Sequence, residues 1–240
     1  MRAVITYFAI GFELSHAAEN SNAEVLPIEV AFTNFPPYSF VEGSNRVYGP
    51  IVTLTEKILK AAGIRYRISG YPLTRLKKSL ANGDINLWLG INGVPNTIPS
   101  PESIISGSVG AYCLKGTQIP QSVSALEDQT IITIYGLSYS GLNFDAAKVT
   151  YHINVDEAPT HESAFRMLVA GRRLCVLDYK EPADYTIKML DLSRMVDYSE
   201  FMKVDFFFEL NANTPHAQET MKKIMNAFHT IKHDEDRIQN

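Results

Sequence analysis

In the first part of the chain, segments whose hydrophobic positions have the period of a strand alternate with segments that have the period of a helix. Where apolar residues alternate with polar ones or run together briefly, the pattern predicts a strand, and where they recur at helical spacing it predicts a helix. After Gly49, for example, Ile51, Leu54 and Ile58 share one helical face, and Gly63 ends the helix. The predicted elements are a strand over 26–33, a helix over 49–63, a strand over 64–71, a helix over 73–81 and a strand over 85–91. This β-α-β-α-β order is typical of a parallel sheet covered by helices.

A similar pattern begins again after a segment rich in Pro, Asn, Ser and Gly over 92–108, which we interpret as a connecting loop. The elements predicted there are strands over 109–114 and 129–135, a helix that opens within 138–148, a strand over 149–155, a helix over 160–170, a strand over 173–179, a helix near 182–190 and a strand over 203–210. A last helix carries an apolar stripe of Met221, Ile224, Met225, Phe228 and Ile231. We interpret that stripe as core.

One short module occurs twice in the chain. TRLKKSLANGDINLWLGI at 74–91 and SAFRMLVAGRRLCVLDY at 163–179 each combine an amphipathic helix, a glycine stop and an apolar strand. The repetition predicts two α/β lobes of similar build. Two such lobes place a cleft between them at the carboxyl ends of their strands, and a hinge allows them to close on a small ligand.

Composition narrows the class of protein. The chain has 240 residues, 45% hydrophobic content and a formal net charge of -4. These values are typical of a folded globular protein, and without a basic stripe we expect no nucleic-acid partner. No run of 18 or more apolar residues occurs, so we expect no membrane-spanning helix.

The N-terminus resembles a secretory signal peptide. Arg2 precedes an apolar stretch, and the small residues Ser15 and Ala17 suit cleavage after position 17. The alternative is a buried first strand. We expect residues 1–17 to be removed and the mature protein to be periplasmic. No cysteine lies near the cleavage site to carry a lipid, so no lipid anchor is expected.

The sequence contains two cysteines, Cys113 and Cys175. An exported protein can pair them, yet both lie in apolar strand-like segments where a lone cysteine behaves as a small core residue. The sequence leaves these alternatives open. It contains no CxxC motif or Cys/His cluster, and we expect no metal and no cofactor.

Several motifs of the mature chain occur together in a characteristic order. Within 32–68, an aromatic-Pro-Pro-aromatic-Ser motif precedes a Gly before the first long helix, and an L-x-x-G-x-x-(N/D) turn leads into a later strand. The chain from about Glu24 to about Lys232 thereby resembles the family 3 extracellular solute-binding proteins, the periplasmic amino-acid-binding proteins of ABC importers. The resemblance implies a hinged α/β fold of the type II periplasmic-binding class.

In that fold the chain crosses twice between the lobes. The resemblance implies crossings near 108–111 and 203–205, with a first lobe of 24–109 plus 205–240 and a second lobe of 110–204.

The resemblance also implies ligand-binding residues. Phe35 occupies the position of the family's ligand-facing aromatic residue, with Tyr38 nearby. Arg75 stands where many relatives carry an Arg that grips a carboxylate. Ser138 and Ser140 stand where the family receives an anion at a helix N-terminus. The alternatives are core contacts for the two aromatic residues, a solvated helix face for Arg75 and N-capping for the two serines.

Other positions depart from the family pattern. After the strand that ends at Asn92, itself assigned to the site, relatives carry an Arg that holds the ligand α-carboxylate, but the aligned position here is near Ile98. The family's amine-binding Asp corresponds to Asp178, but the preceding turn is one residue shorter, so Tyr179 competes for its place. Common L-amino acids are therefore expected to bind weakly, with dissociation constants no lower than about 10 μM.

We expect a monomeric solute-binding protein, without enzymatic activity, that captures a small polar ligand in the cleft between the lobes for an ABC-type importer. The alternatives are a stand-alone sensor component that reports to a receptor, and a cyclohexadienyl-dehydratase-like enzyme on the same fold. The enzyme motifs are incomplete: in GLSYSG, Ser140 stands where a nucleophile elbow requires Gly, and no HExxH is present.

Overall fold

The computed structural model describes residues 26–43 and 46–239. The predicted signal segment, residues 1–17, lies outside the described residues. The first half contains β1 (Ile28–Phe32), β2 (Phe40–Glu42), β3 (Arg46–Tyr48), α1 (Pro50–Ala61), β4 (Tyr66–Gly70), α2 (Leu73–Asn82), β5 (Leu87–Gly90), β6 (Thr97–Pro99) and β7 (Ile105–Leu114). The second half contains η1 (Val123–Leu126), β8 (Thr130–Ile134), η2 (Ser140–Leu142), α3 (Phe144–Thr150), β9 (Asn154–Ala158), α4 (His161–Val169), β10 (Cys175–Tyr179), α5 (Lys180–Met189), β11 (Val196–Asn211) and α6 (Ala217–Gln239).

The two lobes have the same strand order. In the first, β4, β1 and β5 run parallel and β11 pairs antiparallel with β5. In the second, β9, β8 and β10 run parallel and β7 pairs antiparallel with β10. The repeated sequence module forms equivalent pieces in both lobes, because α2–β5 and α4–β10 each place an apolar strand between a parallel and an antiparallel neighbour. The predicted two-lobed α/β fold is confirmed.

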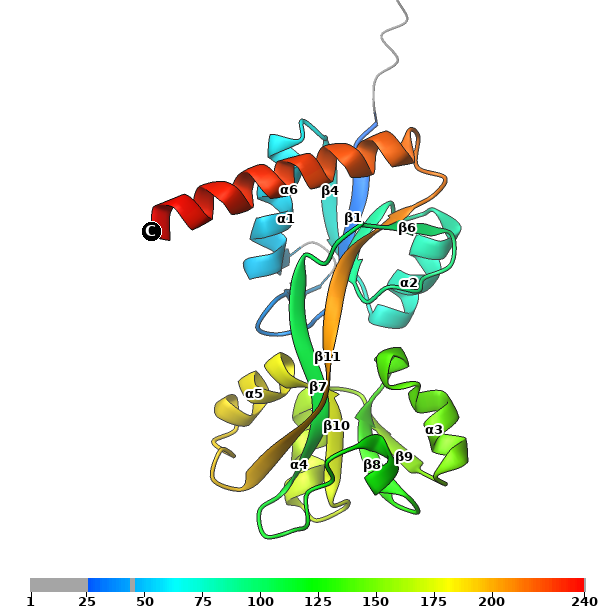
Figure 1. Cartoon of the computed structure of the whole chain (residues 1–240), viewed down its shortest axis with the longest axis vertical. Helices are drawn as coiled ribbons and strands as arrows, with labels where there is room; N and C mark the ends of the chain where they lie inside the picture. The colour runs from blue at the N-terminus through cyan, green and yellow to red at the C-terminus, as the bar shows by residue number, and fades with distance from the viewer. Residues whose placement is uncertain (1–25, 44–45, 240) are drawn as a thin grey trace, which may run out of the picture.

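Two long strands connect the lobes (Figure 1). β7 and β11 pair antiparallel from one lobe into the other, and β11 also pairs with β5 and β6 at its far end. The segments that we expected to cross lie inside these strands. Their pairing register shifts between Glu200 and Met202, a bulge of the kind that locally bends a strand. After β11, α6 returns to pack on α1 of the first lobe.

Three local predictions need correction. The strand expected over 149–155 is wrong, because the helix that begins at Phe144 continues to Thr150 and the strand runs from Asn154 to Ala158. Val149 and Thr150 are β-branched and resemble a strand in sequence, but Val149 is 78% exposed on the helix surface. The segment 92–108 contains β6 and the start of β7, and the strand expected over 203–210 begins earlier, at Val196.

Apolar side chains bury both faces of the sheet. In the first lobe, α1 and α6 cover one face, and Leu76 and Leu80 of α2 pack with Trp88 on the other. In the second lobe, Cys113 and Cys175 lie directly opposite each other on β7 and β10 and form a disulfide. The sequence left that pairing open. Within the described residues, no helix is both long and apolar enough to cross a bilayer.

Candidate functional site

A cavity lies between the two lobes, where strands of both lobes end. The empty space in this region is about 580 Å³, with open solvent at its mouth included. The lining segments follow the carboxyl ends of the parallel strands β1, β5, β8 and β10, and the crossing strands β7 and β11 add one residue each. The lining residues are Phe32, Thr33, Phe35, Ser39, Ile51, Leu73, Lys77, Trp88, Leu89, Gly90, Ile91, Ile105, Leu137, Ser138, Tyr179 and Phe206.

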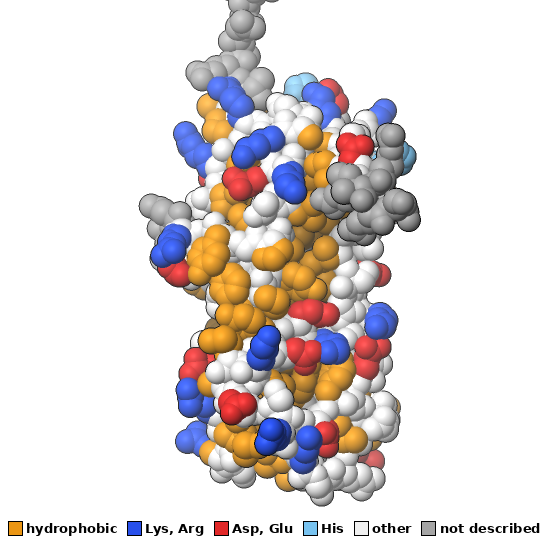
Figure 2. All heavy atoms as spheres, turned by 90° about the vertical axis from the view of Figure 1, so that its left-hand side faces the viewer, with side chains coloured by type: hydrophobic (Ala, Val, Ile, Leu, Met, Phe, Trp, Pro, Cys, Tyr) orange, Lys and Arg blue, Asp and Glu red, His pale blue; other side chains and the backbone are white. Residues whose placement is uncertain are grey.

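Aromatic rings hold the two lobes against each other beside this cavity. Phe35 of the first lobe lies 5.7 Å from the Tyr179 ring and 6.2 Å from the His161 ring of the second lobe, both edge to face. Its ring also lies 5.9 Å from Phe206 of β11 and 6.1 Å from Tyr38, on which it stacks. Such pairs add packing energy beyond the area that they bury. Figure 2 shows a band of apolar side chains at mid-height of one face of the molecule, with charged groups above and below it.

The last two residues of β10 point in different directions. Tyr179 lines the cavity, and its hydroxyl donates a hydrogen bond to the Ser138 carbonyl. Asp178 is wholly buried, and its Oδ1 accepts a hydrogen bond from the Tyr179 backbone N–H at 2.7 Å. Because successive strand residues face opposite sides, only one of the two can line the cavity. That residue is Tyr179.

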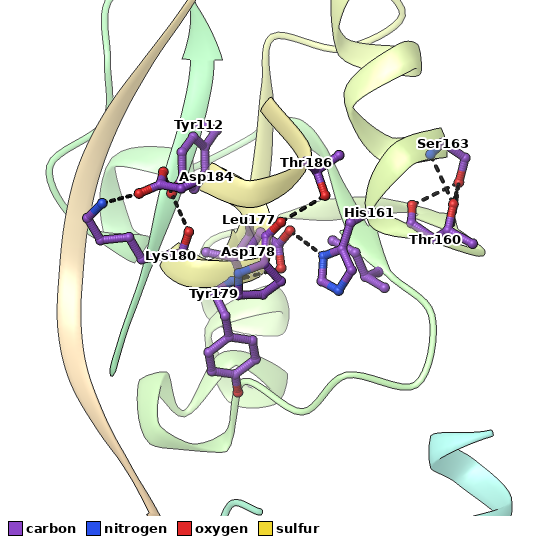
Figure 3. Close-up of polar contacts among 12 residues, drawn as sticks. Tyr112, Thr160, His161, Ser163, Leu177, Asp178, Tyr179, Lys180, Asp184 and Thr186 are labelled. Carbon is purple, nitrogen blue, oxygen red and sulfur yellow. Dashed lines mark hydrogen bonds and ion pairs between the residues drawn. The ribbon is translucent and has the colours of Figure 1, made fainter. Parts of the chain in front are cut away.

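Asp178 has a partner of its own. Its Oδ2 lies 2.7 Å from Nδ1 of the buried His161, as Figure 3 shows. Burial raises the pKa of the Asp178 carboxyl, and the His161 imidazole opposes that rise. Burial also raises the pKa of the Tyr179 hydroxyl, so this group stays neutral and able to donate. The Asp178–His161 pair therefore holds the end of β10 on the side that faces away from the cavity.

His161 was missed in the sequence. It is the first residue of α4, directly after Thr160, whose side chain caps the helix by accepting a hydrogen bond from the Ser163 N–H at 3.0 Å. The Ser163 hydroxyl in turn accepts from the Thr160 N–H. The Thr-x-x-Ser spacing signals where the helix begins, and therefore that His161 is fixed at its start. Nothing in the sequence links it to Asp178.

Lys77 is the charged residue among those that line the cavity, and the sequence analysis did not single it out. Its side chain is half-buried one turn after Leu73, and burial lowers the pKa of its ammonium group. Leu73, Leu76, Lys77 and Leu80 follow helical spacing. That spacing is the available signal, because it places Lys77 on the buried side of α2. Arg75 points elsewhere: it is exposed, with its guanidinium carbon 5.5 Å from the centre of the Tyr71 ring.

The other predicted site residues are divided among three places. Ser138 lines the cavity with Phe35 and Tyr179. Asn92 and Ser140 are exposed and line a neighbouring hollow, which shares Ile91 and Tyr179 with the cavity. Tyr38 is half-buried against Phe35. Ile98, at the position of the missing Arg, lies in β6 opposite Leu210 and packs against the first-lobe core.

Among the described residues, few groups in this region are suited to metal binding or catalysis. Among the residues that the structure describes, no three His, Cys, Asp or Glu side chains come together as a metal site. The His161–Asp178 pair lies beside Tyr179, whose hydroxyl already donates to a carbonyl. The arrangement is suited to enclosing a small molecule between aromatic walls, with one cation on the α2 side.

No family model matches the sequence. No curated protein matches it either. Solved structures do resemble it. An ancestral arginine-binding protein bound to arginine has a TM-score of 0.72 at 19% identity, covering 87% of this chain and 93% of that one. A histidine kinase sensor domain with similarity to periplasmic binding proteins has a TM-score of 0.73 at 14% identity, covering 88% and 92%.

A third similar structure is the ancestral amino acid-binding protein AncCDT-1, a precursor of cyclohexadienyl dehydratase, with a TM-score of 0.67 at 17% identity, covering 87% of this chain and 91% of that one. At these identities the likeness shows the fold, which is that of the two-lobed periplasmic binding proteins.

Proposed function

We propose that the chain is a solute-binding protein that encloses a small ligand between its lobes. The observation that carries this proposal is the cavity at the carboxyl ends of β1, β5, β8 and β10, to which both lobes contribute side chains. A ligand in that position contacts both lobes only when they are closed. It therefore favours the closed form by its differential affinity for the two forms.

Family membership is part of the proposal. The aromatic-Pro-Pro-aromatic-Ser motif and the order of the later motifs support a place among the family 3 extracellular solute-binding proteins. Similar structures include proteins bound to arginine, glutamine and glutamate, which supports a small-molecule ligand for this chain too. The proposed lobes are 24–109 with 205–240, and 110–204. We propose export through cleavage after Ala17, and action as a monomer without catalysis.

The receiving partner is either the permease of an ABC importer or a signalling receptor. A specific observation supports the second role, since a histidine kinase sensor domain is among the similar structures. The AncCDT-1 likeness keeps an enzyme on this fold as the competing hypothesis. Its signature would be turnover of an added acid, whereas a binding protein returns the compound unchanged.

A binding screen followed by scattering tests the proposal. The purified protein is screened by thermal shift against amino acids, opines, polyamines and small carboxylates, and binding is then followed by fluorescence. Trp88, the single tryptophan of the chain, lines the cavity and serves as the reporter. A hit that binds one to one and reduces the radius of gyration in small-angle scattering supports the proposal. A tight ligand that causes no compaction, or one that is consumed, contradicts it.

A further inference from the structure

We propose, on the basis of the solute-binding function above, that the cleft ligand is an apolar monocarboxylate without an amino group, and that Lys77 binds its carboxylate. The proposal deepens the assigned function by naming a ligand class that differs from the amino acids named in similar structures. Three features of the cavity carry it: the apolar walls, the unpaired lysine, and the lack of a facing acid.

The walls of the cavity are mostly aromatic and aliphatic. Phe32 ends β1 and Phe35 follows it, Trp88 lies within β5, and Phe206 and Tyr179 come from β11 and β10. Trp88 and Phe35 are only 6% and 8% exposed, so their rings are held in place by packing. A ring-bearing or branched apolar body recovers contact area against such walls, whereas a body rich in hydroxyl groups would leave them unpaired.

Two hydrogen bonds within the protein already occupy polar groups of the lining. The Ser39 hydroxyl donates to the Thr33 carbonyl at 2.8 Å, and the Ser138 carbonyl accepts from the Tyr179 hydroxyl. Lys77 differs, because its ammonium group has no hydrogen bond or ion pair with any residue in the described part of the chain. A half-buried cation without a partner is stabilised most by an anion that enters with the ligand.

No acid faces Lys77 across the cavity. None of the residues that line it in the described structure is Asp or Glu. Asp178 is wholly buried and bonded to His161. Glu181 is half-buried near Gly107 of β7, where its Oε2 has no hydrogen-bond partner among the described residues, but it is not one of the residues that line the cavity. An α-ammonium group in this cavity would therefore lack an anionic partner. A carboxylate without an amine matches the charge of the lining, and an amino acid does not.

A matched ligand series tests the proposal on the full chain. One apolar body is offered as a carboxylate, an amide, an amine and an amino acid: 3-phenylpropionate, 3-phenylpropionamide, phenethylamine and L-phenylalanine. Hexanoate and indole-3-acetate are tested as further carboxylates. Binding is measured by Trp88 fluorescence and calorimetry. We expect at least one carboxylate to bind. Where the series includes the amide, the amine and the amino acid of the same body, the carboxylate should bind at least about tenfold more tightly than each of them.

Two matched variants separate the lysine from general charge. Lys77→Met should weaken the carboxylate at least about tenfold and leave the amide unchanged, because the lost term is the charge-assisted contact. Lys78→Met, the next residue on α2, is exposed and should leave both unchanged. Thermal melting of both variants checks that α2 remains folded.

The failures of the two proposals are distinguishable. An amine or amino acid that binds as tightly as the best carboxylate, with compaction, overturns the ligand class but supports the solute-binding function. Carboxylate binding that is unchanged in Lys77→Met also overturns this assignment. If no carboxylate binds, the ligand class is wrong. If no compound in the wider screen binds either, the solute-binding function is contradicted as well.

Discussion

At the scale of single residues, two buried acids differ in how many of their carboxylate oxygens are hydrogen-bonded. Asp178 has both carboxylate oxygens bonded, one to a backbone N–H and one to His161. Glu209 of β11 is equally inaccessible, but Thr97 bonds only one oxygen and the other has no partner among the described residues. Burial therefore raises the pKa of Glu209, and the Thr97 bond only partly opposes that.

The first prediction concerns Glu209→Gln. A raised pKa in the folded state means that Glu209 favours folding when protonated, and that this contribution is lost as pH rises through the folded-state value. The amide cannot ionise, so the variant should gain stability relative to the natural protein as pH rises. We expect a gain of about 1–2 kcal/mol at pH 8 and almost none at pH 4.

Urea denaturation at the two pH values measures this difference. Glu219→Gln is the control, because Glu219 is exposed on α6 and pairs with Lys223. A gain for Glu209→Gln of equal size at both pH values would show that ionisation is not the cause.

The second prediction compares the two members of the buried pair. His161→Leu keeps an apolar group against Phe35 but leaves one oxygen of the buried Asp178 carboxyl without its partner, which should cost about 3 kcal/mol. Asp178→Asn should cost less, about 1 kcal/mol, because a carboxamide still accepts from the Tyr179 N–H and still reaches His161. At this chain length, each kcal/mol lowers the melting temperature by about 2–4 °C. Equal losses in the two variants would contradict the pairing argument.

At the scale of elements, the sequence predicts the fold where the signal is local. The helix over 50–61 and the strand over 28–32 follow directly from apolar spacing, and Gly63 and Gly83 end their helices with positive φ angles of 67° and 90°. The hairpin of β2 and β3 and the early start of β11 were not predicted. Residues 196–202 pair only with β7, about 90 positions away, so no local pattern reveals them.

The third prediction concerns the disulfide between β7 and β10. Cys113 and Cys175 are separated by 62 positions, so their bond restricts a large loop of the unfolded chain. A loop of this size corresponds to about 4 kcal/mol in the chain-entropy model, and measured values are commonly about 2–4 kcal/mol. The double variant Cys113→Ala/Cys175→Ala should lose about that much stability. Comparing the oxidised and reduced natural protein in urea separates the bond itself from the change of side chain. Identical midpoints would contradict a stabilising role.

At the scale of the whole molecule, the site was predictable only in part. Phe35, Ser138 and Tyr179 were named from the family resemblance, and all three line the cavity. Lys77 and Trp88 were not named. A cavity wall depends on how α2 and β5 of one lobe meet the loop after β8 in the other lobe, and the sequence does not show that. Those segments are about 50 positions apart in the chain, and only the crossing strands bring them together.

A contact between the lobes beside the cavity offers a test of closure that does not disturb the core. A Cβ atom placed on Gly136, in the turn after β8, would lie 3.0 Å from the Thr74 hydroxyl oxygen on α2, so the two lobes touch here. Thr74 is exposed, and its replacement should leave folding unchanged. Thr74→Phe adds bulk that only the closed form must accommodate.

The fourth prediction is that Thr74→Phe weakens ligand binding without lowering the melting temperature. If the added ring costs the closed form about 1.5 kcal/mol, affinity for any ligand that needs closure falls about tenfold. Scattering of the ligand-saturated variant should also give a larger radius of gyration than the natural protein. Thr74→Ser, which keeps the hydroxyl and adds no bulk, is the control and should bind normally. Unchanged affinity and compaction in Thr74→Phe would show that the lobes do not need to meet at Gly136 in order to hold a ligand.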